Sequence, residues 1–337
     1  MGVNLGSLIK GREISISELA GKVLAVDASM WIHQFLASIR APDGTLFCDK
    51  KGRTTSHLIG LSSRIANLLE ANIKLVFCFD GKPPELKLAE KERRTAIKEE
   101  ALKQYREALI KGELEEARKY AMRTTTLTDE IIASAKKLIS AFGLPIIQAP
   151  QEADAQAAYL VKQNDAFAVS TNDYDALLFG APRMVKNISI YGKKIVHGRQ
   201  ITIKPELIIL SALLQELGIN HDQLIALGIL IGTDYNPGGI HGIGPKRALE
   251  LVKQFKCDFK ALFAHVKWSS LNPVDWSEIF NIFKSMPVEK NYRITFKEPD
   301  KKAIEKILIE EYDFSEERVK NIIEKAIKEQ KGLQKWL

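Results

Sequence analysis

Short apolar runs alternate along the chain with longer segments whose apolar residues recur every three or four positions. The short runs predict buried strands, and the amphipathic segments predict helices between them. Strands are predicted at residues 22–27, 73–80, 144–148 and 166–170, and helices at 28–40, 56–71, 128–143 and 221–232. Strands and helices that alternate in this way form a parallel sheet flanked by helices, so we expect an α/β fold. A strand pair within 183–203, with a turn at Gly192, is expected to extend the sheet.

Acidic residues mark the ends of these strands. Asp27, Asp80 and Asp173 each lie at or just past a predicted strand end. The carboxyl ends of parallel strands meet at one edge of a sheet, and ligands bind at that edge in such folds. Three separate strands therefore deliver a carboxylate to the same edge.

A further group of acids lies between two of these strands. Glu152 and Asp154 are two residues apart, so they share a site only in the first turn of a helix, and Pro150 favours a helix that starts there. Asp173 and Asp175 form a similar pair. Each pair alone has a plainer interpretation, because acids favour helix N-termini and turns. Clustered carboxylates repel each other unless a cation neutralises them, and oxygen ligands favour a hard divalent metal.

Residues 81–123 carry many charges of both signs and few large apolar side chains, which predicts a long solvated helical excursion. Lys87 and Arg94 are seven residues apart within it, so they project from one helix face. An ordinary charged surface helix explains this spacing at least as well. The excursion begins directly after Asp80, however, and so starts at the acidic edge.

A glycine-rich segment, GTDYNPGGIHGIGPKR, lies between two predicted helices at residues 232–247. Asp234 follows the first helix, and Pro245 suits the first position of the second. The glycines allow the backbone to approach a phosphate closely, and the second helix offers its N-terminal amides and basic side chains. This pattern is typical of helix-hairpin-helix binding to the duplex backbone without sequence preference. The candidate DNA contacts are Gly232, Gly242, Gly244, Lys246 and Arg247.

Composition narrows the function classes. A chain of 337 residues with a net charge of +7 and 45% hydrophobic residues is large enough for a core and a second helical lobe. A basic surface combined with an acidic site suits a nucleic-acid enzyme. Cys48, Cys78 and Cys257 form no CxxC spacing, so neither a disulfide framework nor a zinc site is expected, and the compartment is expected to be reducing. No apolar run has membrane-spanning length, and no membrane partner is expected.

The last residues, QKGLQKWL, carry an apolar cluster at helical spacing. One short helical turn presents Gln330, Leu333, Trp336 and Leu337 together as a plug for a partner pocket. The alternative is a frayed terminus, which does not ordinarily expose a Trp and a Leu together.

The motifs VDAS, FCFDGKPP, QEADAQAA, NDYDALLFG, GTDYNPG and GIGPKRAL together resemble the flap endonuclease family of structure-specific 5′ nucleases, in its archaeal form. The resemblance covers nearly the whole chain. It implies a PIN-like, Rossmann-like α/β core with a parallel-core sheet, a helical arch insertion and a helix-hairpin-helix lobe. The implied boundaries are a nuclease core at 1–220 with the arch at about 81–130, a helical lobe at 221–328 and a clamp-binding tail at 329–337.

The same resemblance implies hydrolysis of phosphodiester bonds at the base of 5′ flaps, with 5′–3′ exonuclease activity, in Okazaki fragment maturation and repair. It implies two Mg²⁺ ions, with Mn²⁺ as a substitute, because two divalent ions need about this many carboxylates. Asp80, Glu152 and Asp154 are expected to hold one ion, and Asp173 and Asp175 the other. Asp27 and Asp234 are expected to act through bound water. The pair Glu152 and Asp154 departs from the two glutamates of many relatives, but the shorter arm still ligates.

Further roles follow from the resemblance alone. Lys87 and Arg94 are expected to contact the scissile phosphate, and the amine of Gly2 to lie near the site. The segment from Arg40 to His57 is expected to hold the junction and a short 3′ flap, and a potassium ion to assist the helix-hairpin-helix. His33 stands where relatives commonly place a stacking tyrosine, and imidazole offers less stacking area, so this role is left open.

The expected partners are branched DNA, as 5′ flap and nicked or gapped duplex, and a sliding clamp bound by the tail. We expect a monomer located in the cytoplasm at a prokaryotic nucleoid, or in the nucleus of a eukaryotic source. A Holliday-junction or nucleotide-excision relative is disfavoured by the arch region and the tail. A non-catalytic clamp-associated protein does not need seven acids at one sheet edge, and a phosphatase or nucleotide-binding domain lacks its GxxxxGK[ST] loop or nucleophile motif here.

Overall fold

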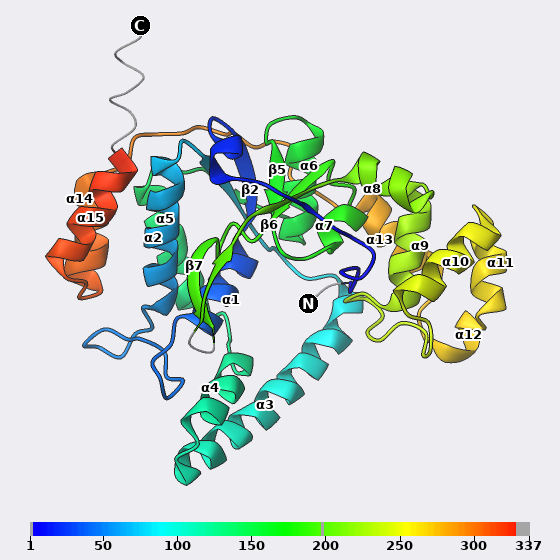
Figure 1. Ribbon diagram of the computed structural model, residues 1–337, viewed down its shortest axis with the longest axis horizontal. Coiled ribbons are helices and arrows are strands. Elements are labelled where there is room, and N and C mark those ends of the chain that lie inside the picture. The colour runs from blue at the N-terminus through cyan, green and yellow to red at the C-terminus, as the bar shows by residue number, and fades with distance from the viewer. Residues whose placement is uncertain (1–2, 197–198, 328–337) are drawn as a thin grey trace, which may run out of the picture. The chain divides into compact units, whose positions relative to one another are not determined.

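The computed structural model describes residues 3–196 and 199–327, with the elements labelled in Figure 1. These residues fall into two compact units, which are treated separately. Unit 1 contains the chain up to Ser15, Asp80–Lys91 and Gln148–Lys290. Unit 2 contains Ile16–Phe79, Glu92–Ile147 and the chain from Asn291.

Unit 1 contains a mixed set of strands in the order β1-β9-β6-β5. Their bounds are β1 Arg12–Glu13, β5 Ala168–Ser170, β6 Arg183–Lys186 and β9 Glu206–Ile209. β5 and β6 are parallel, whereas β9 runs antiparallel to both β6 and β1. The predicted strand at 166–170 is therefore confirmed, and its three residues in β5 are all buried.

Of the strand pair predicted within 183–203, the first strand is confirmed as β6, which pairs with β5, but its pairing across a turn at Gly192 is wrong. β6 ends at Lys186 because Asn187 adopts a left-handed conformation with φ 66°, and its amide donates to Asn172 Oδ1 at 2.8 Å. Gly192 begins a new strand, β7 Gly192–Val196, which pairs antiparallel with β8 Arg199–Ile203 as a separate two-stranded sheet. The larger sheet is extended instead by β9, which pairs with β6.

The helices of unit 1 surround α9 (His221–Ile231), which packs against α7, α10 and α13. Most of its side chains are buried, and Asn220 and Gln223 cap its N-terminus reciprocally. Pro245 occupies the first position of α10, as predicted. The other helices are η2 Glu85–Lys87, α6 Ala153–Lys162, α7 Asp175–Leu178, α8 Leu210–Leu217, α10 Pro245–Phe255, α11 Phe259–His265, α12 Trp268–Leu271 and α13 Trp276–Ser285.

Unit 2 is built on the parallel pair β2 (Val23–Asp27) and β3 (Lys74–Phe79), followed by β4 (Ile146–Gln148). Their apolar residues are almost fully buried, as expected of strands covered on both faces. Trp31 meets Phe77 of β3 edge to face at 5.8 Å between ring centroids. The flanking helices are η1 Ile16–Leu19, α1 Ala28–Ser38, α2 Ser56–Glu70, α5 Asp129–Ala141, α14 Lys301–Glu305, the π-helix η3 Lys306–Glu311 and α15 Glu316–Ile327.

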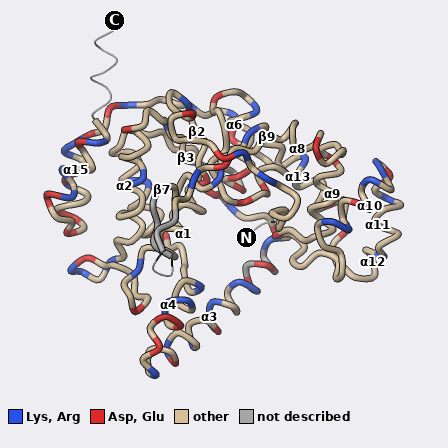
Figure 2. Tube along the Cα trace, viewed as in Figure 1, with Lys and Arg blue, Asp and Glu red and all other residues tan. Residues whose placement is uncertain are grey.

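The charged excursion predicted after Asp80 forms two helices, α3 (Leu88–Lys111) and α4 (Leu114–Arg123), joined at Gly112. Figure 2 shows basic and acidic positions interspersed along α3. The fold is therefore the predicted α/β class, with parallel strand pairs and flanking helices. No helix in the described ranges is long and apolar enough to cross a membrane.

Candidate active site

The β3–η2 loop and the segment before α6 are joined by backbone hydrogen bonds. The amide of Gly81 donates to Gln151 O at 2.6 Å, and the amide of Lys82 donates to Pro150 O at 3.1 Å. A side chain at Gly81 has no room, since its Cβ would lie 2.2 Å from Pro150 O. Glycine is thus needed here for close approach of two backbones.

This contact places two predicted ligand segments side by side. Asp80 Oδ1 accepts a hydrogen bond of 2.8 Å from the amide of Ala153, the first residue of α6. Glu152 is the N-cap of that helix, and Asp154 lies in its first turn, as the sequence predicted. The helix N-terminus favours negative charge, so α6 partly stabilises all three carboxylates.

The second acidic pair is held by a turn at the start of α7. Asp175 donates its amide to Asp173 Oδ1 at 3.1 Å, and Asp173 donates its own to Thr171 Oγ1 at 3.2 Å. Asp175 is buried and accepts a hydrogen bond of 2.8 Å from the amide of Val3. Sequence reasoning missed Val3, because a backbone donor leaves no mark in the side-chain pattern.

Asp234 is presented by a tight turn after α9. Thr233 Oγ1 accepts from the amide of Tyr235 at 3.1 Å and bonds Asn236 Oδ1 at 2.7 Å, and Asn236 Nδ2 donates to Ile229 O at 2.7 Å. Asp234 and Tyr235 are both buried. Burial, and then the negative charge of Glu152, raise the pKa of Tyr235, so its phenol stays protonated beside the acids.

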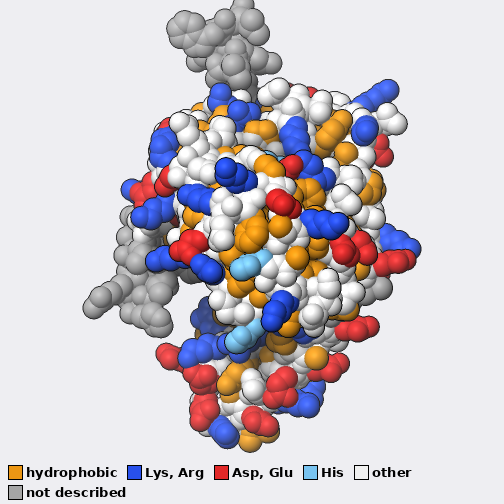
Figure 3. All heavy atoms as spheres, turned by 90° about the vertical axis from the view of Figure 1, so that its right-hand side faces the viewer, with side chains coloured by type: hydrophobic (Ala, Val, Ile, Leu, Met, Phe, Trp, Pro, Cys, Tyr) orange, Lys and Arg blue, Asp and Glu red, His pale blue; other side chains and the backbone are white. Residues whose placement is uncertain are grey.

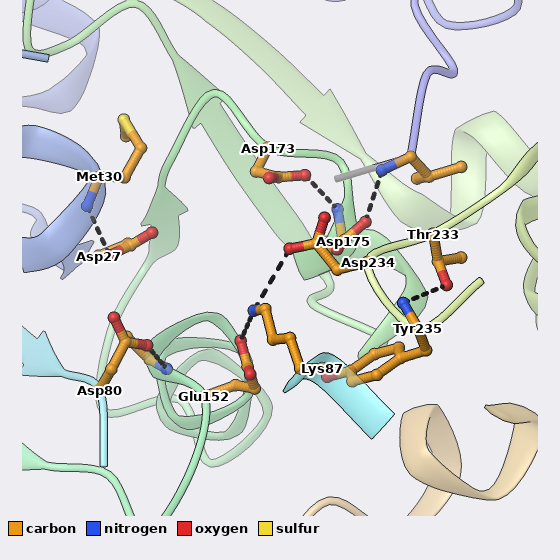
Figure 4. Close-up of polar contacts among 12 residues, drawn as sticks. Asp27, Met30, Asp80, Lys87, Glu152, Asp173, Asp175, Thr233, Asp234 and Tyr235 are labelled. Atoms are coloured by element: carbon orange, nitrogen blue, oxygen red, sulfur yellow. Dashed lines mark hydrogen bonds and ion pairs between the residues drawn. The ribbon is translucent and has the colours of Figure 1, made fainter. Parts of the chain in front are cut away.

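Lys87 is the basic side chain that lies among these acids (Figure 4). Its Nζ is 2.6 Å from Glu152 Oε2 and 3.3 Å from Asp234 Oδ2. Burial lowers the pKa of Lys87, but Glu152 and Asp234 more than offset this, so its net pKa lies above the usual value. The ammonium group is therefore held charged.

Burial and mutual repulsion act on the other carboxylates of the site. Burial raises the pKa of Asp175 well above its usual range, and the neighbouring charge of Asp173 raises it further. Burial also raises the pKa of Glu152, and the ion pair with Lys87 only partly reverses this. A bound cation would lower these raised pKa values, and the donors are carboxylate oxygens, which suit a hard divalent metal.

In the described part of the chain, no group of three or more His, Cys, Asp or Glu side chains is positioned to hold a metal ion. The donor types of Asp80, Glu152, Asp154, Asp173 and Asp175 nevertheless fit a divalent metal.

The predicted site residues of unit 2 have local roles of their own. Asp27 ends β2 and caps α1, accepting from the amide of Met30 at 3.0 Å. Arg94 lies in α3 and is partly exposed. His33 is exposed on α1, yet desolvation by its neighbours and the positive charge of Lys98 lower its pKa to about 4. Its imidazole is therefore neutral at physiological pH.

Arg40 is bound within the protein. It is buried, and its guanidinium donates to Leu36 O at 2.8 Å, Gly44 O at 2.8 Å and Thr125 Oγ1 at 3.0 Å. These contacts fix the turn after α1. A DNA contact by Arg40 stays a prediction.

The glycine-rich segment forms a turn between α9 and α10. Gly232 and Gly242 have φ values of 113° and 82°, which favour glycine. Gly244 is the N-cap of α10, with open space at its Cβ position. Lys246 and Arg247 are exposed in the first turn of α10, where Arg247 also pairs with Glu250 at 3.0 Å. Figure 3 views the molecule from the side that carries α10–α12, and both signs of charge appear on it.

Five predicted residues lie outside the described ranges, so their roles stay predictions. They are Gly2, Gln330, Leu333, Trp336 and Leu337.

Comparison with protein families identifies the class. The XPG N-terminal domain family matches residues 1–101, and the XPG I-region family matches residues 143–234. These ranges include every predicted metal ligand. The α/β fold and the acidic site, with these matches, define a nuclease that hydrolyses phosphodiester bonds.

Comparison with individual proteins narrows the class of nuclease further. Flap endonuclease 1 of Pyrococcus horikoshii is 49% identical over 100% of this chain and 98% of its own length. Flap endonuclease 1 of Hyperthermus butylicus is 47% identical over 100% and 99%. The structure of flap endonuclease-1 from Methanococcus jannaschii is 40% identical, with a TM-score of 0.75 and coverage of 97% and 98%. The catalytic core of Rad2, solved with a DNA substrate, is 25% identical with a TM-score of 0.69, covering 94% of this chain and 96% of its own.

The chain belongs to the flap endonuclease family, in its archaeal form. It is a structure-specific 5′ flap endonuclease of replication and repair, as the motifs predicted.

Proposed function

We propose that the chain cleaves 5′ flaps with two Mg²⁺ ions held by its acidic cluster. The proposal is supported by the raised pKa values of Asp175 and Glu152, because buried carboxylates that are costly to ionise favour the binding of a cation. Asp80, Glu152 and Asp154 hold one ion, and Asp173 and Asp175 the other. Asp27 and Asp234 act through bound water. When bound, the ions lower the pKa of the attacking water and stabilise the leaving oxygen.

The other residues of the site position the substrate. Lys87, once released from Glu152, and Arg94 contact the scissile phosphate and stabilise the charge that develops on it. The turn Gly232–Gly244 and the N-terminus of α10 bind the duplex backbone, with a potassium ion assisting. The segment from Arg40 to His57 holds the junction and a short 3′ flap.

Branched DNA and a sliding clamp are the proposed partners. The Rad2 core has been solved with a DNA substrate, which supports DNA binding by the same fold here. The tail Gln330–Leu337 provides the clamp contact, and the enzyme works as a monomer at the nucleoid, with 5′–3′ exonuclease activity alongside flap cleavage. The domain boundaries near residues 220 and 328 and the arch at about 81–130 are part of the same proposal.

The carboxylate assignment is tested with Asp173→Asn and Asp175→Asn. Both variants lose a charged ligand, so single-turnover cleavage of a 5′ flap should fall by on the order of 10³-fold, a few kcal/mol of barrier. Flap binding, measured by band shift in Ca²⁺, should stay within about threefold, because most phosphate contacts lie elsewhere.

Asp165→Asn is the matched control, since Asp165 is an exposed acid in the same unit. Its cleavage rate should equal that of the wild type. If Asp173→Asn and Asp175→Asn cleave at the wild-type rate, Asp173 and Asp175 are not metal ligands.

A further inference from the structure

Three helices of unit 1 present acidic residues of the site at one of their ends. Glu152 and Asp154 lie at the start of α6, Asp173 and Asp175 at or just before the start of α7, and Asp234 just after the end of α9. α6 has 10 residues and α9 has 11, so the other end of each lies about 15 Å along the helix from its acids. The spacing between the acidic segments therefore depends on how these three helices are held together.

α7 depends most on its surroundings, because it is a single turn. A helix of one turn is not stable by itself, so contacts with neighbouring segments must hold it. At its N-terminal end the amide of Val3 donates to Asp175 Oδ1 at 2.8 Å. Its C-terminal end closes at Gly180, which has φ 79° and donates its amide to Leu177 O at 2.9 Å. α7 thus takes its position from contacts at both ends.

Two basic side chains bind carbonyl groups at the C-terminal end of α7. Lys162, the last residue of α6, donates from Nζ to Phe179 O at 2.7 Å. His221, the first residue of α9, has its Nε2 at 3.0 Å from Leu177 O. A carbonyl oxygen only accepts, so Nε2 of His221 carries the hydrogen. The ends of α6, α7 and α9 that lie opposite to the acids are therefore joined by two hydrogen bonds.

Close packing surrounds these two hydrogen bonds. A Cβ at Gly180 would lie 2.9 Å from Lys162 Nζ and 3.2 Å from His221 Cε1, so both basic side chains reach the same turn. A Cβ at Gly228 of α9 would lie 2.8 Å from Leu178 Cδ1, so α7 and α9 approach closely. Because densely packed interiors transmit strain, loss of either hydrogen bond displaces the helices as well as the turn.

We propose that Lys162 and His221 are positioning residues that fix the spacing of the acidic segments by joining α6 and α9 to the C-terminal end of α7. The inference rests on the proposed function, in which these segments hold the divalent ions. Both side chains act through backbone carbonyls at the helix ends away from the acids. Groups that orient metal ligands in this way affect metal affinity, because ligands already in place lose less freedom when the ion binds.

The plainer interpretation is that Lys162 is an ordinary C-terminal cap. Lysine side chains often bind the last carbonyls of a helix and stabilise it there. A cap of this kind changes the free energy of unfolding and leaves the metal affinity of the folded protein unchanged. Metal affinity therefore separates the two roles.

The test measures Mn²⁺ binding to the enzyme without DNA by electron paramagnetic resonance, together with the Mg²⁺ dependence of single-turnover flap cleavage. Lys162→Met removes the donor and keeps the length of the side chain, so the dissociation constant of Mn²⁺ should rise about tenfold. The Mg²⁺ concentration for half-maximal cleavage should rise by a similar factor, and saturating Mg²⁺ should restore most of the rate. Lys162→Arg still donates to a carbonyl and should bind Mn²⁺ almost as the wild type does.

His221 provides a second, independent pair of variants. His221→Leu removes the donor to Leu177 O and should weaken Mn²⁺ binding, whereas His221→Gln keeps an N–H donor and should retain most of the affinity. Amide hydrogen exchange of residues 175–181 should accelerate in Lys162→Met and in His221→Leu, because the C-terminal end of α7 is then held by one hydrogen bond fewer.

Lys284→Met is the matched control for the loss of a positive charge. Lys284 is a neighbouring lysine of the same unit, and its ammonium pairs with Asp222 at 2.6 Å. The variant should leave both Mn²⁺ affinity and the exchange of residues 175–181 close to wild type.

The outcomes are distinct. Wild-type Mn²⁺ affinity in Asp175→Asn would overturn the metal assignment of the proposed function, and with it the inference. Weakened Mn²⁺ binding by Asp175→Asn, together with wild-type affinity in Lys162→Met and His221→Leu, would overturn the role of the two basic residues alone. A loss of affinity that is equally large in Lys162→Arg and His221→Gln would also overturn it, because the hydrogen bonds are then not the cause. If Lys162→Met does not fold, the two His221 variants decide by the same measurements.

Discussion

At the scale of single residues, two kinds of group compete for the Lys87 ammonium: the carboxylates of the site and the proposed scissile phosphate. The ammonium pairs with Glu152 and Asp234. The proposed mechanism needs the same group at the scissile phosphate. A metal ion held by Glu152 would therefore compete with Lys87 for this carboxylate and leave the ammonium available to the phosphate.

This competition predicts an effect on metal binding. Lys87→Ala should bind Mn²⁺ about tenfold more tightly than the wild type in the absence of DNA, because a nearby positive charge is removed from the acids. The same variant should cleave flaps on the order of 10²- to 10³-fold more slowly, since it loses a contact to the transition state. Titration followed by electron paramagnetic resonance measures the free-enzyme affinity.

Lys82→Ala is the control, because Lys82 is an exposed lysine of the same loop. It should raise Mn²⁺ affinity far less. Unchanged or weaker Mn²⁺ binding by Lys87→Ala would show that the ammonium does not compete with the metal.

At the scale of elements, the ends of the predicted strands were the features that best predicted where the acidic residues of the site lie. β2 ends at Asp27, and Asp80 directly follows β3, where the apolar runs placed them. Buried parallel strands can be recognised in a sequence because most of their residues are apolar, and the acid at or after the end of the apolar run is easily seen. The end of β6 was misassigned because it depends on the left-handed conformation of Asn187, which the apolar pattern does not reveal.

Contacts between segments that are distant along the chain could not be predicted from the sequence. The pairing of Lys87 with Glu152 and the donation from the Val3 amide to Asp175 join residues that are 65 and 172 positions apart. Secondary-structure propensity and hydrophobic periodicity describe residues that are close in sequence, so they do not predict such pairs. The resemblance assigned Lys87 a phosphate contact, and the carboxylate contact came from the structure.

The close contact between the backbone at Gly81 and the backbone of residues 149–151 leaves no room for a side chain, so it is sensitive to substitution. Gly81→Ala places a Cβ 2.2 Å from Pro150 O and 2.3 Å from Ala149 O, so the two segments must separate. We expect unfolding free energy to fall by about 2–3 kcal/mol. Mn²⁺ affinity should also fall, because Asp80 and Glu152 move apart. Denaturant titration and metal titration measure the two effects.

Gly6→Ala is the matched control, since the nearest atom to a Cβ there is 3.7 Å away. It should leave both quantities close to wild type. A fully stable Gly81→Ala variant with normal Mn²⁺ affinity would contradict the packing argument.

At the scale of the whole molecule, the catalytic and partner-binding functions are proposed to be separable. The acids other than Asp27 lie in unit 1, whereas the proposed junction segment from Arg40 to His57 lies in unit 2. The proposed clamp contact lies in neither of these segments but in the last eight residues.

Removal of residues 330–337 should therefore leave flap cleavage by the isolated enzyme unchanged and abolish its stimulation by the sliding clamp. An aromatic anchor such as Trp336 tends to supply much of the energy of a small interface, so Trp336→Ala with Leu337→Ala should weaken clamp binding about 100-fold. Calorimetric titration of clamp into each enzyme measures this. Undiminished clamp affinity of the truncated enzyme would refute the tail assignment.

Metal-dependent cutting at a branch is the central proposed property of the enzyme, and one measurement tests it directly. A 5′-labelled flap substrate and an unbranched single strand are each incubated with excess enzyme in Mg²⁺, in Ca²⁺ and in EDTA. The account predicts cleavage at the base of the flap in Mg²⁺, binding without productive cleavage in Ca²⁺, which is larger and more loosely coordinated, and no cleavage in EDTA. Cleavage that persists in EDTA, or equal cutting of the unbranched strand, would contradict it.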